Sequence, residues 1–332
     1  MTDTRHRVSI DAIREPVIQK CEDLEDYFRR YLSTDVPVID RIFEHLLDGG
    51  GKRFRPLLVL LISSFNENAS EEDVYRLAVS VEFIHTATLL HDDVVDQSDM
   101  RRGHRVAYRL WGAEPSVLSG DYLLSRAFSL LVDIGHLSIL EKISTATTLM
   151  ARGEVLQLLR SFSTATSMEE YLEVIEGKTA SLFAASCTSA GYLSGFEGDF
   201  LDALENFGRN LGFSFQIIDD ILDYTADLGE LGKTIGKDFM EGKVTLPIIL
   251  LMECLESEKR REVADIFLKD SPESEDFQLV LSLMRQCGTL EKAQDFAQDY
   301  ANRAKGNLEH LPPGEIRTSL EGIASYVTRR RT

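Results

Sequence analysis

Apolar residues recur along this chain with the spacing of helices rather than that of strands. Between Ser70 and Asp96 they occupy positions i, i+3, i+4 and i+7, at Val74, Leu77, Ala78, Val81 and Ile84. We find no convincing pair of alternating segments and no hairpin turn signal, and only 8 prolines occur in 332 residues. The pattern predicts an all-α protein that forms a single domain over residues 1–332.

Local signals place the expected helices. Ser70 to Asp73 is similar to a capping box and begins a long helix, and Pro56 suits the first turn of the helix after the glycine run 49–51. A Gly/Lys-rich loop spans 226–243, and helices resume near Leu246. The other expected helices cover about 8–32, 37–48, 115–133, 138–161, 168–192 and 198–225.

Two of these helices end in the same aspartate pattern, DDVVD at 92–96 and DDILD at 219–223. Residues four apart share a helix side, so Asp92 and Asp96 continue the inward apolar face of their helix. A buried carboxylate costs several kcal/mol unless a cation compensates it. In the second helix a stripe typical of a cavity wall leads to the aspartates, through Gly208, Gly212, Gln216, Asp219 or Asp220, and Asp223.

One such cluster could be an ordinary helix end, but two inward copies favour a metal site. Carboxylate oxygens suit Mg²⁺, which keeps several waters and takes phosphate oxygens as its other ligands. We therefore predict two facing clusters that clamp Mg²⁺ ions around one diphosphate. Asp93 is the least certain ligand, because it lies ~100° around the helix from Asp92. The predicted metal ligands are Asp92, Asp93, Asp96, Asp219, Asp220 and Asp223.

The net charge of −19 argues against a nucleic acid as the partner. An anionic substrate must therefore be held by metal ions or by local basic groups. Candidates lie beside glycines or beside the aspartate clusters: Lys52, Arg53, Arg55, Arg101, Arg102, Lys178, Lys233 and Lys243. His85 lies two turns before Asp92 on the same face, where it is either a substrate contact or an ordinary core histidine.

Several other classes of function are disfavoured. GKT occurs at 177–179 and 232–234, but Leu172 and Asp227 stand where a phosphate-binding Walker A loop needs glycine. The four cysteines form no CxxC pair, which indicates neither a zinc site nor a disulfide framework and fits a reduced cytoplasmic protein. We expect no secretory signal at the N-terminus and no transmembrane segment.

Five segments resemble the motifs of the trans-type prenyl diphosphate synthases, in the right order and spacing over about residues 45–250. They are GGGKRFRP, IHTATLLHDDVVDQSDMRRG, GKTASLF, FQIIDDILDY and LGKTIGKDFMEGKVTLP. The two-residue gap in DDVVD is most similar to the bacterial octaprenyl and decaprenyl enzymes. The resemblance implies a homodimer of antiparallel helical bundles, each around a central cavity. It also implies head-to-tail condensation of an allylic diphosphate with isopentenyl diphosphate.

The resemblance also implies roles for single residues. About three Mg²⁺ ions would be bound, by Asp92 and Asp96 from one side and by Asp219, with Asp220 and Asp223, from the other. Lys178 and Lys233 would join Asp92, Asp96 and Asp219 in catalysis. The allylic diphosphate would be surrounded by Arg101, Lys178, Thr179, Gln216, Lys233 and Lys243. Isopentenyl diphosphate would be held by Lys52, Arg55, His85 and Arg102. The loop 226–243 would act as a lid that excludes water.

Product length is expected to depend on what blocks the tunnel below the first aspartate cluster. Enzymes similar to farnesyl diphosphate synthases often carry an aromatic residue four or five positions before it, where this chain has Thr88 and Ala87. We therefore predict a product of about C25 or longer, since five residues of helix span ~7.5 Å. A farnesyl or geranylgeranyl diphosphate synthase is the alternative. Phe128 is either the tunnel floor or an ordinary core residue.

Two rival functions stay open. A class I terpene cyclase also uses DDxxD, but its second metal motif usually combines Asn or Asp with Ser or Thr and Glu, unlike DDILD. A non-catalytic subunit of a heteromeric synthase would be expected to have lost one cluster, whereas both are intact. The tail YVTRRRT either closes over the diphosphates or is a disordered basic end, and we expect the second. Transient membrane contact could accompany product release.

Overall fold

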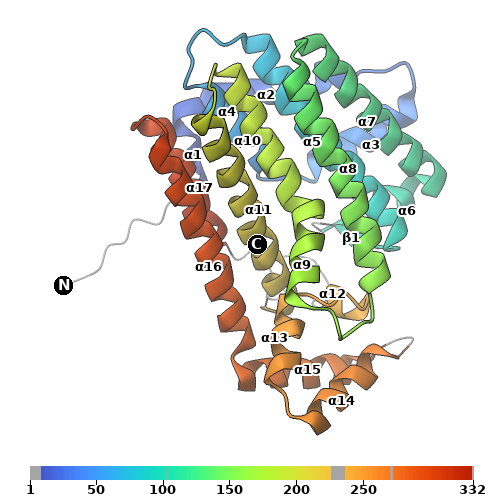
Figure 1. The fold of residues 1–332 in the computed structure, drawn as a ribbon. Helices are drawn as coiled ribbons and strands as arrows, with labels where there is room; N and C mark the ends of the chain where they lie inside the picture. Colours follow the sequence, from blue (N-terminus) through green and yellow to red (C-terminus); the bar gives the residue numbers. More distant parts are fainter. Residues whose placement is uncertain (1–8, 102, 226–235, 270–271, 331–332) are drawn as a thin grey trace.

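The computed structural model describes residues 9–101, 103–225, 236–269 and 272–330. Helices dominate these residues (Figure 1), which confirms the all-α prediction. The helical elements are α1 (Ile10–Arg14), the 3-10 turn η1 (Glu15–Val17), α2 (Ile18–Leu32), α3 (Pro37–Asp48), α4 (Phe54–Ser63), α5 (Glu71–Val95), α6 (Ala107–Trp111), α7 (Ala113–Ile134), α8 (Leu137–Arg160), α9 (Met168–Ile175), the π-helical turn η2 (Glu176–Ala180), α10 (Ser181–Leu193), α11 (Asp199–Thr225), α12 (Lys237–Met240), α13 (Leu246–Cys254), α14 (Ser257–Phe267), α15 (Ser274–Cys287), α16 (Thr289–Asn307), the 3-10 turn η3 (Leu308–His310) and α17 (Glu315–Val327).

The structure departs from the expected elements at three places. The first helix is divided by η1, where Pro16 cannot supply a backbone N–H to a continuous helix. A two-residue hairpin pairs β1 (Met100–Arg101) with β2 (His104–Arg105), although we expected no strand pair. Strands this short leave no alternating pattern in a sequence. Within the expected loop 226–243, the described part contains the single helical turn α12.

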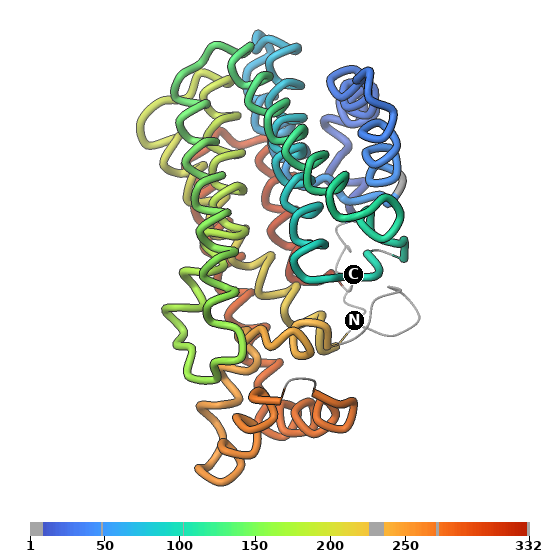
Figure 2. Tube along the Cα trace, turned by 90° about the vertical axis from the view of Figure 1, so that its right-hand side faces the viewer, coloured from blue at the N-terminus to red at the C-terminus, as the bar shows by residue number. Residues whose placement is uncertain are grey.

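The long helices lie side by side in a bundle (Figures 1 and 2), with α10 among its most buried members. Helix α10 packs against α4, α5, α8 and α11, while α5 packs against α7 and α11 against α16. This packing holds the C-terminal ends of α5 and α11, which carry the two aspartate clusters, in one part of the molecule. A second, smaller apolar cluster joins α13, α14 and α15 to Phe239 of α12 and Tyr224 of α11.

Glycines allow three of these helices to approach closely. A Cβ atom on Gly208 would lie 2.6 Å from the Phe183 carbonyl oxygen, and one on Gly212 would lie 2.5 Å from the Ala180 Cα. Gly208 is therefore a contact point between α11 and α10, and Gly212 is one between α11 and η2, so the two glycines serve helix packing and do not begin a cavity wall as the sequence indicated. Gly177 similarly sits against the Leu149 carbonyl of α8, where its added Cβ would come within 2.7 Å.

This close contact coincides with the π-helical turn η2, which separates α9 from α10. Such turns insert one extra residue into a helix and occur often at functional sites. Here the turn carries Lys178 and Thr179, the two polar residues of the first GKT segment. Gly177 therefore serves helix packing, and Lys178 and Thr179 after it lie at the site described below.

Candidate active site

The first aspartate cluster closes α5, whose N-cap Ser70 accepts a hydrogen bond from the Asp73 backbone N–H. Asp92 and Asp96 are half-buried, whereas Asp93 is buried and points toward the hairpin. Both Nε and a terminal nitrogen of Arg101 lie 2.9 Å from Oδ1 of Asp93. We predicted Arg101 as a ligand for an anion and not as a counter-charge for the aspartates. The structure pairs it with Asp93, because the chain turns back directly after α5, where the Ser98 backbone N–H donates to the Asp93 carbonyl oxygen at 3.1 Å.

The Asp92 carboxylate lies in an unfavourable setting for a negative charge. Burial raises its pKa to about 6, and the charges of Glu154 and Asp96 act in the same direction. Lys178 and Arg101 lower the pKa but only partly offset this effect. A further cation beside this carboxylate would lower its pKa and favour the ionised form.

Two lysines from the segment after α11 reach Asp96. The Lys243 ammonium lies 3.0 Å from Asp96 Oδ2 and 2.7 Å from Glu241. Burial lowers the pKa of Lys243, but the charges of Asp238, Asp96 and Glu241 outweigh this effect, and the pKa is raised overall. Lys237 donates to Ser98 at 2.6 Å and lies 3.9 Å from Asp96. Lys243 was predicted from the sequence. Lys237 was missed, because its segment was interpreted as a loop without defined direction.

The second cluster, on α11, has one buried member and two partly exposed ones. Asp219 is partly exposed and lies 2.7 Å from a terminal nitrogen of Arg330. Asp220 is buried and accepts hydrogen bonds from Tyr171 at 2.6 Å and from Gln216 at 2.8 Å. Burial, aided by Asp238, raises the pKa of Asp220 to about 8.

Asp223 connects the second cluster to the first through α12. Its two oxygens accept the backbone N–H groups of Lys237 at 3.2 Å and Asp238 at 3.0 Å. The Lys237 side chain meanwhile reaches Ser98 and Asp96 at the end of α5. The two clusters, about 127 positions apart in sequence, are thus brought together around one helical turn. Burial and Asp238 also raise the pKa of Asp223 to about 8.

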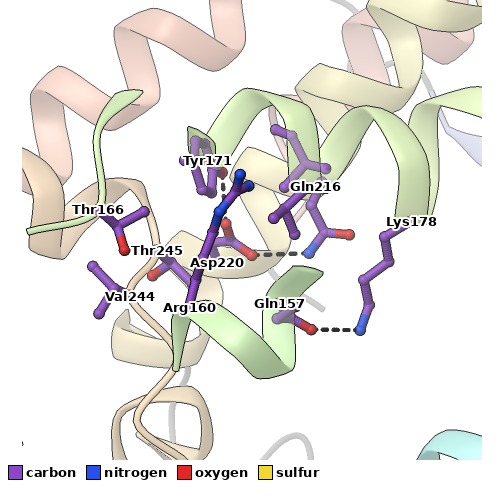
Figure 3. Close-up of a pocket in the computed structure, with 11 residues that line it drawn as sticks. Gln157, Arg160, Thr166, Tyr171, Lys178, Gln216, Asp220, Val244 and Thr245 are labelled. Carbon is purple, nitrogen blue, oxygen red and sulfur yellow. Dashed lines mark hydrogen bonds between the residues drawn. The ribbon is translucent and has the colours of Figure 1, made fainter. Parts of the chain in front are cut away.

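Lys178 and Gln216, two of the residues predicted around the allylic diphosphate, line a pocket with an empty volume of about 420 Å³ between α8, α9, η2 and α11. Figure 3 shows Lys178 beside Gln157, at 2.9 Å, and Gln216 beside Asp220. Lys178 also forms an ion pair with Glu154 at 2.7 Å. Thr179 donates to the Gln216 side-chain oxygen at 2.6 Å. The structure therefore joins Thr179 and Gln216 to Asp220 of the second aspartate cluster, whereas Lys178 contacts Glu154 and Gln157 of α8.

The residues predicted to hold isopentenyl diphosphate are not all linked to one another in the structure. Arg55 is buried with its guanidinium 4.4 Å from the Phe183 ring centroid, and burial lowers its pKa to about 10 despite Glu82 and Asp219. Its Nε has no hydrogen-bond partner among the residues that the structure describes. Lys52 lies over the Tyr326 ring, at 5.3 Å from its centroid. His85 lines a second cleft beside Asp93 and Arg101. Arg102 and Lys233 lie outside the described residues.

The C-terminal tail contributes a residue that sequence reasoning missed. Arg330 has only 5% of its side chain exposed, and one terminal nitrogen lies 2.7 Å from both Asp219 Oδ1 and the Phe215 carbonyl oxygen. Its guanidinium lies 3.8 Å from the Phe215 ring centroid. The expectation of a disordered basic end is therefore wrong up to this residue. Helix α17 returns the chain to α11, and the only signal in the sequence was the run of three arginines.

The donor atoms of the site suit a metal that arrives with its substrate. No three acidic, histidine or cysteine side chains within the described residues are arranged to hold a metal ion by themselves. Mg²⁺ does not need such a cage, because it binds through one or two carboxylates, waters and substrate phosphates. The buried carboxylates with raised pKa values, together with the unpartnered Arg55 Nε, fit a metal–diphosphate complex between them.

Comparisons with known proteins agree with this geometry. The family model "Polyprenyl synthetase" matches residues 36–284. The chain is 37% identical over 326 residues to an octaprenyl diphosphate synthase of Escherichia coli, covering 97% of this chain and 99% of that protein. It is 38% identical over 320 residues to an all-trans-nonaprenyl-diphosphate synthase of Rhodobacter capsulatus, covering 96% and 97% of the two chains.

A solved structure is similar over almost the whole chain. The polyprenyl synthase of Caulobacter crescentus, in complex with calcium and isoprenyl diphosphate, superposes with a TM-score of 0.94 at 38% identity. The match covers 99% of this chain and 100% of that one. The bundle, the paired aspartate clusters and these matches lead to one conclusion: the chain belongs to the polyprenyl synthetase family.

Proposed function

We propose that the protein is a trans-prenyltransferase that condenses an allylic diphosphate with isopentenyl diphosphate, head to tail, into a medium- or long-chain all-trans polyprenyl diphosphate. One observation carries this proposal. The two aspartate clusters meet around α12, with Lys237 in contact with both. The relatives named as octaprenyl and all-trans-nonaprenyl diphosphate synthases support the product class. Two intact clusters disfavour a non-catalytic subunit.

The family depends on divalent metal ions, and we propose Mg²⁺, about three per site, for this chain. Asp92 and Asp96 would hold it from α5, and Asp219 with Asp223 from α11, while Asp93 and Asp220 are already engaged by protein donors. Bound Mg²⁺ supplies stabilisation of the negative charge that develops on the departing diphosphate. Arg330 contacts only Oδ1 of Asp219, which leaves the other carboxylate oxygen for a metal.

The chain's own residues would perform the rest. Lys178 and Lys243 would bind the allylic diphosphate, with Thr179 and Gln216 orienting it, so that its charge is stabilised as the carbon–oxygen bond breaks. Arg55, Lys52 and His85 would hold isopentenyl diphosphate, whose double bond then attacks the allylic cation. The proton lost from the new carbon–carbon skeleton passes to the released diphosphate, so no side-chain nucleophile is required.

One assay tests this function and its rivals. The purified protein is incubated with Mg²⁺, farnesyl diphosphate and radiolabelled isopentenyl diphosphate, and the butanol-extractable products are sized. We expect a ladder that ends at about C25 or longer, and none in the presence of a chelator. Absence of any product would contradict the enzyme proposal, and cyclic hydrocarbons would favour a terpene cyclase. A product ladder that stops at about C15 or C20 would indicate a short-chain synthase and contradict the predicted product length.

We further propose a homodimer formed through an apolar stripe on α7 and α8. The exposed apolar side chains along these two helices are Leu118, Val132, Leu137, Val155, Leu158 and Leu159. Leu118 and Val132 lie fourteen positions apart on α7, close to four helical turns, and therefore share one side. A continuous apolar surface on a folded chain marks an interaction site. The family resemblance makes a second copy of this chain its occupant.

Leu159→Glu is expected to dissociate this dimer, because it places a carboxylate in the centre of an apolar contact. Sedimentation velocity at micromolar concentration should show a dimer for the wild type and a monomer for the variant. Leu268→Glu is the matched control, since Leu268 is as exposed as Leu159 (73% and 76%) but follows α14. A monomeric wild type, or a dimer that survives Leu159→Glu unchanged, would refute the stripe as the interface.

No helix in the described part of the chain is long and apolar enough to cross a membrane. We propose that the enzyme acts in the cytoplasm, where thiols stay reduced, and the four cysteines are all free in the structure. Transient membrane contact during release of the polyprenyl product remains part of this proposal.

A further inference from the structure

Tyr171 is joined to the second aspartate cluster by a chain of short hydrogen bonds. Its hydroxyl donates to Asp220 Oδ2 at 2.6 Å, and the Gln216 amide donates to Asp220 Oδ1 at 2.8 Å. The Gln216 oxygen in turn accepts from Thr179 at 2.6 Å. Figure 3 shows the tyrosine and the glutamine approaching the carboxylate from different elements, α9 and α11. Each oxygen of Asp220 therefore has one fixed donor.

The elements around Tyr171 hold its hydroxyl in place. Helix α9 begins with a complete capping box, in which Ser167 and Glu170 satisfy each other's backbone N–H groups, immediately before Tyr171. Tyr171 is only 3% exposed. An ordinary tyrosine hydroxyl is protonated at neutral pH, so it can donate to the carboxylate.

We propose that Tyr171 is a positioning residue, whose hydroxyl locks the Asp220 carboxylate and thereby orients Asp219 and Asp223 on the same helix end toward the metal–diphosphate complex. The inference deepens the proposed function and rests on it for the identity of the ligand. Asp219 is one residue before Asp220, and Asp223 is less than one helical turn after it. Without the tyrosine hydroxyl the Asp220 carboxyl group would be free to turn toward Asp219 and Asp223, where its oxygens would compete for the same metal ions.

The test is Tyr171→Phe, which removes the donor and keeps the ring. Binding of inorganic diphosphate is measured by calorimetry with and without Mg²⁺. Loss of a group that orients metal ligands typically weakens binding 10- to 100-fold, and we expect a fall of about this size in the Mg²⁺-dependent affinity. In steady-state assays the KM for the allylic diphosphate and the Mg²⁺ requirement should rise, while the KM for isopentenyl diphosphate changes less than about twofold.

Tyr224→Phe is the matched control. Tyr224 is 1% exposed on the same helix, directly after Asp223, and donates no hydrogen bond to a carboxylate. Both variants lose one buried hydroxyl, so a purely structural effect would weaken them equally. We expect Tyr224→Phe to bind Mg²⁺–diphosphate like the wild type. An unchanged affinity in Tyr171→Phe, or an equal loss in Tyr224→Phe, overturns the inference.

A second pair of variants covers the case in which Tyr171→Phe does not fold, as judged by circular dichroism. Incorporation of 4-fluorophenylalanine at position 171 fills the space of the hydroxyl without a donor, and 4-aminophenylalanine restores an N–H donor. Only the second should recover diphosphate affinity, and equal affinity in both overturns the inference. Because calorimetry needs no turnover, a loss of binding in an enzyme without prenyltransferase activity would uphold the positioning role and refute the proposed function alone.

Discussion

Asp96→Ala is expected to lower kcat/KM for polyprenyl formation by about a thousandfold, the scale seen when one group that stabilises a developing anion is removed. Asp96 shares a helix side with Asp92. Its carboxylate lies 3.0 Å from the Lys243 ammonium, and Lys243 belongs to the same segment whose Asp238 backbone N–H donates to Asp223. Its loss would remove a metal ligand and one of the two partners that hold the Lys243 ammonium. The measurement is initial rate against allylic diphosphate concentration at several Mg²⁺ concentrations, with isopentenyl diphosphate saturating, so that kcat/KM is obtained directly.

Asp99→Ala provides the comparison for this variant. Asp99 lies three residues beyond Asp96 and is largely exposed, and its side chain pairs with Arg109 at 2.8 Å, outside the cluster. An exposed ion pair of this kind contributes little, so activity should stay within about twofold of the wild type. If Asp96→Ala retained activity similar to that of Asp99→Ala, the first cluster would be an ordinary helix end and the two-cluster site would be wrong.

Thr88→Phe is expected to shorten the product from about C25 or longer to about C15 or C20. Thr88 is half-buried one turn before Asp92, on the side of α5 that leads to the metal site, and its hydroxyl is satisfied by the His85 carbonyl at 2.7 Å. An aromatic ring there would meet the growing chain within its first ~7.5 Å of travel along the helix. The product ladder is read by reversed-phase chromatography, with kcat for the first condensation as the internal reference.

The neighbouring position separates a tunnel effect from general damage. Ala87 is 1% exposed and packed in the main core, so Ala87→Phe should lower the free energy of unfolding by about 1–3 kcal/mol through overpacking. Phe128→Ala addresses the predicted floor, since Phe128 is only half-buried on α7 and packs against the core from one side. Longer products from Phe128→Ala would support Phe128 as the tunnel floor. An unchanged product ladder in both Thr88→Phe and Phe128→Ala would contradict a product tunnel that runs past these two residues.

Local patterns predicted the framework of the site well. The helical repeat and the capping serine at position 70 predicted α5 nearly to its ends, and the same repeat predicted α11. Because residues four apart must share one side of a helix, the aspartates could be placed in a common orientation without knowledge of any partner helix. The hairpin after α5 and the turn α12 were missed, since elements of two to four residues leave no periodic signal.

The partners of the charged groups could not be predicted in this way. We interpreted Arg101 as an anion ligand, but it is the counter-charge of Asp93, and Arg330 was expected in a disordered end but covers Asp219. Tyr171, which locks Asp220, carried no motif that separated it from other helical tyrosines. Each pairing depends on the angle at which two side chains leave different elements, and a repeat within one element contains no such information.

The sequence by itself therefore determined the class of fold, the two carboxylate clusters and the chemistry that they imply, because these depend on contacts within a few residues. The tertiary structure alone decided which cation meets which aspartate. Lys243 and Asp96 are 147 positions apart, and Arg330 and Phe215 are 115 apart. Such contacts form only after the packing of α10 against α8 and α11, through glycines that admit close backbone approach, has set the spacing of the bundle.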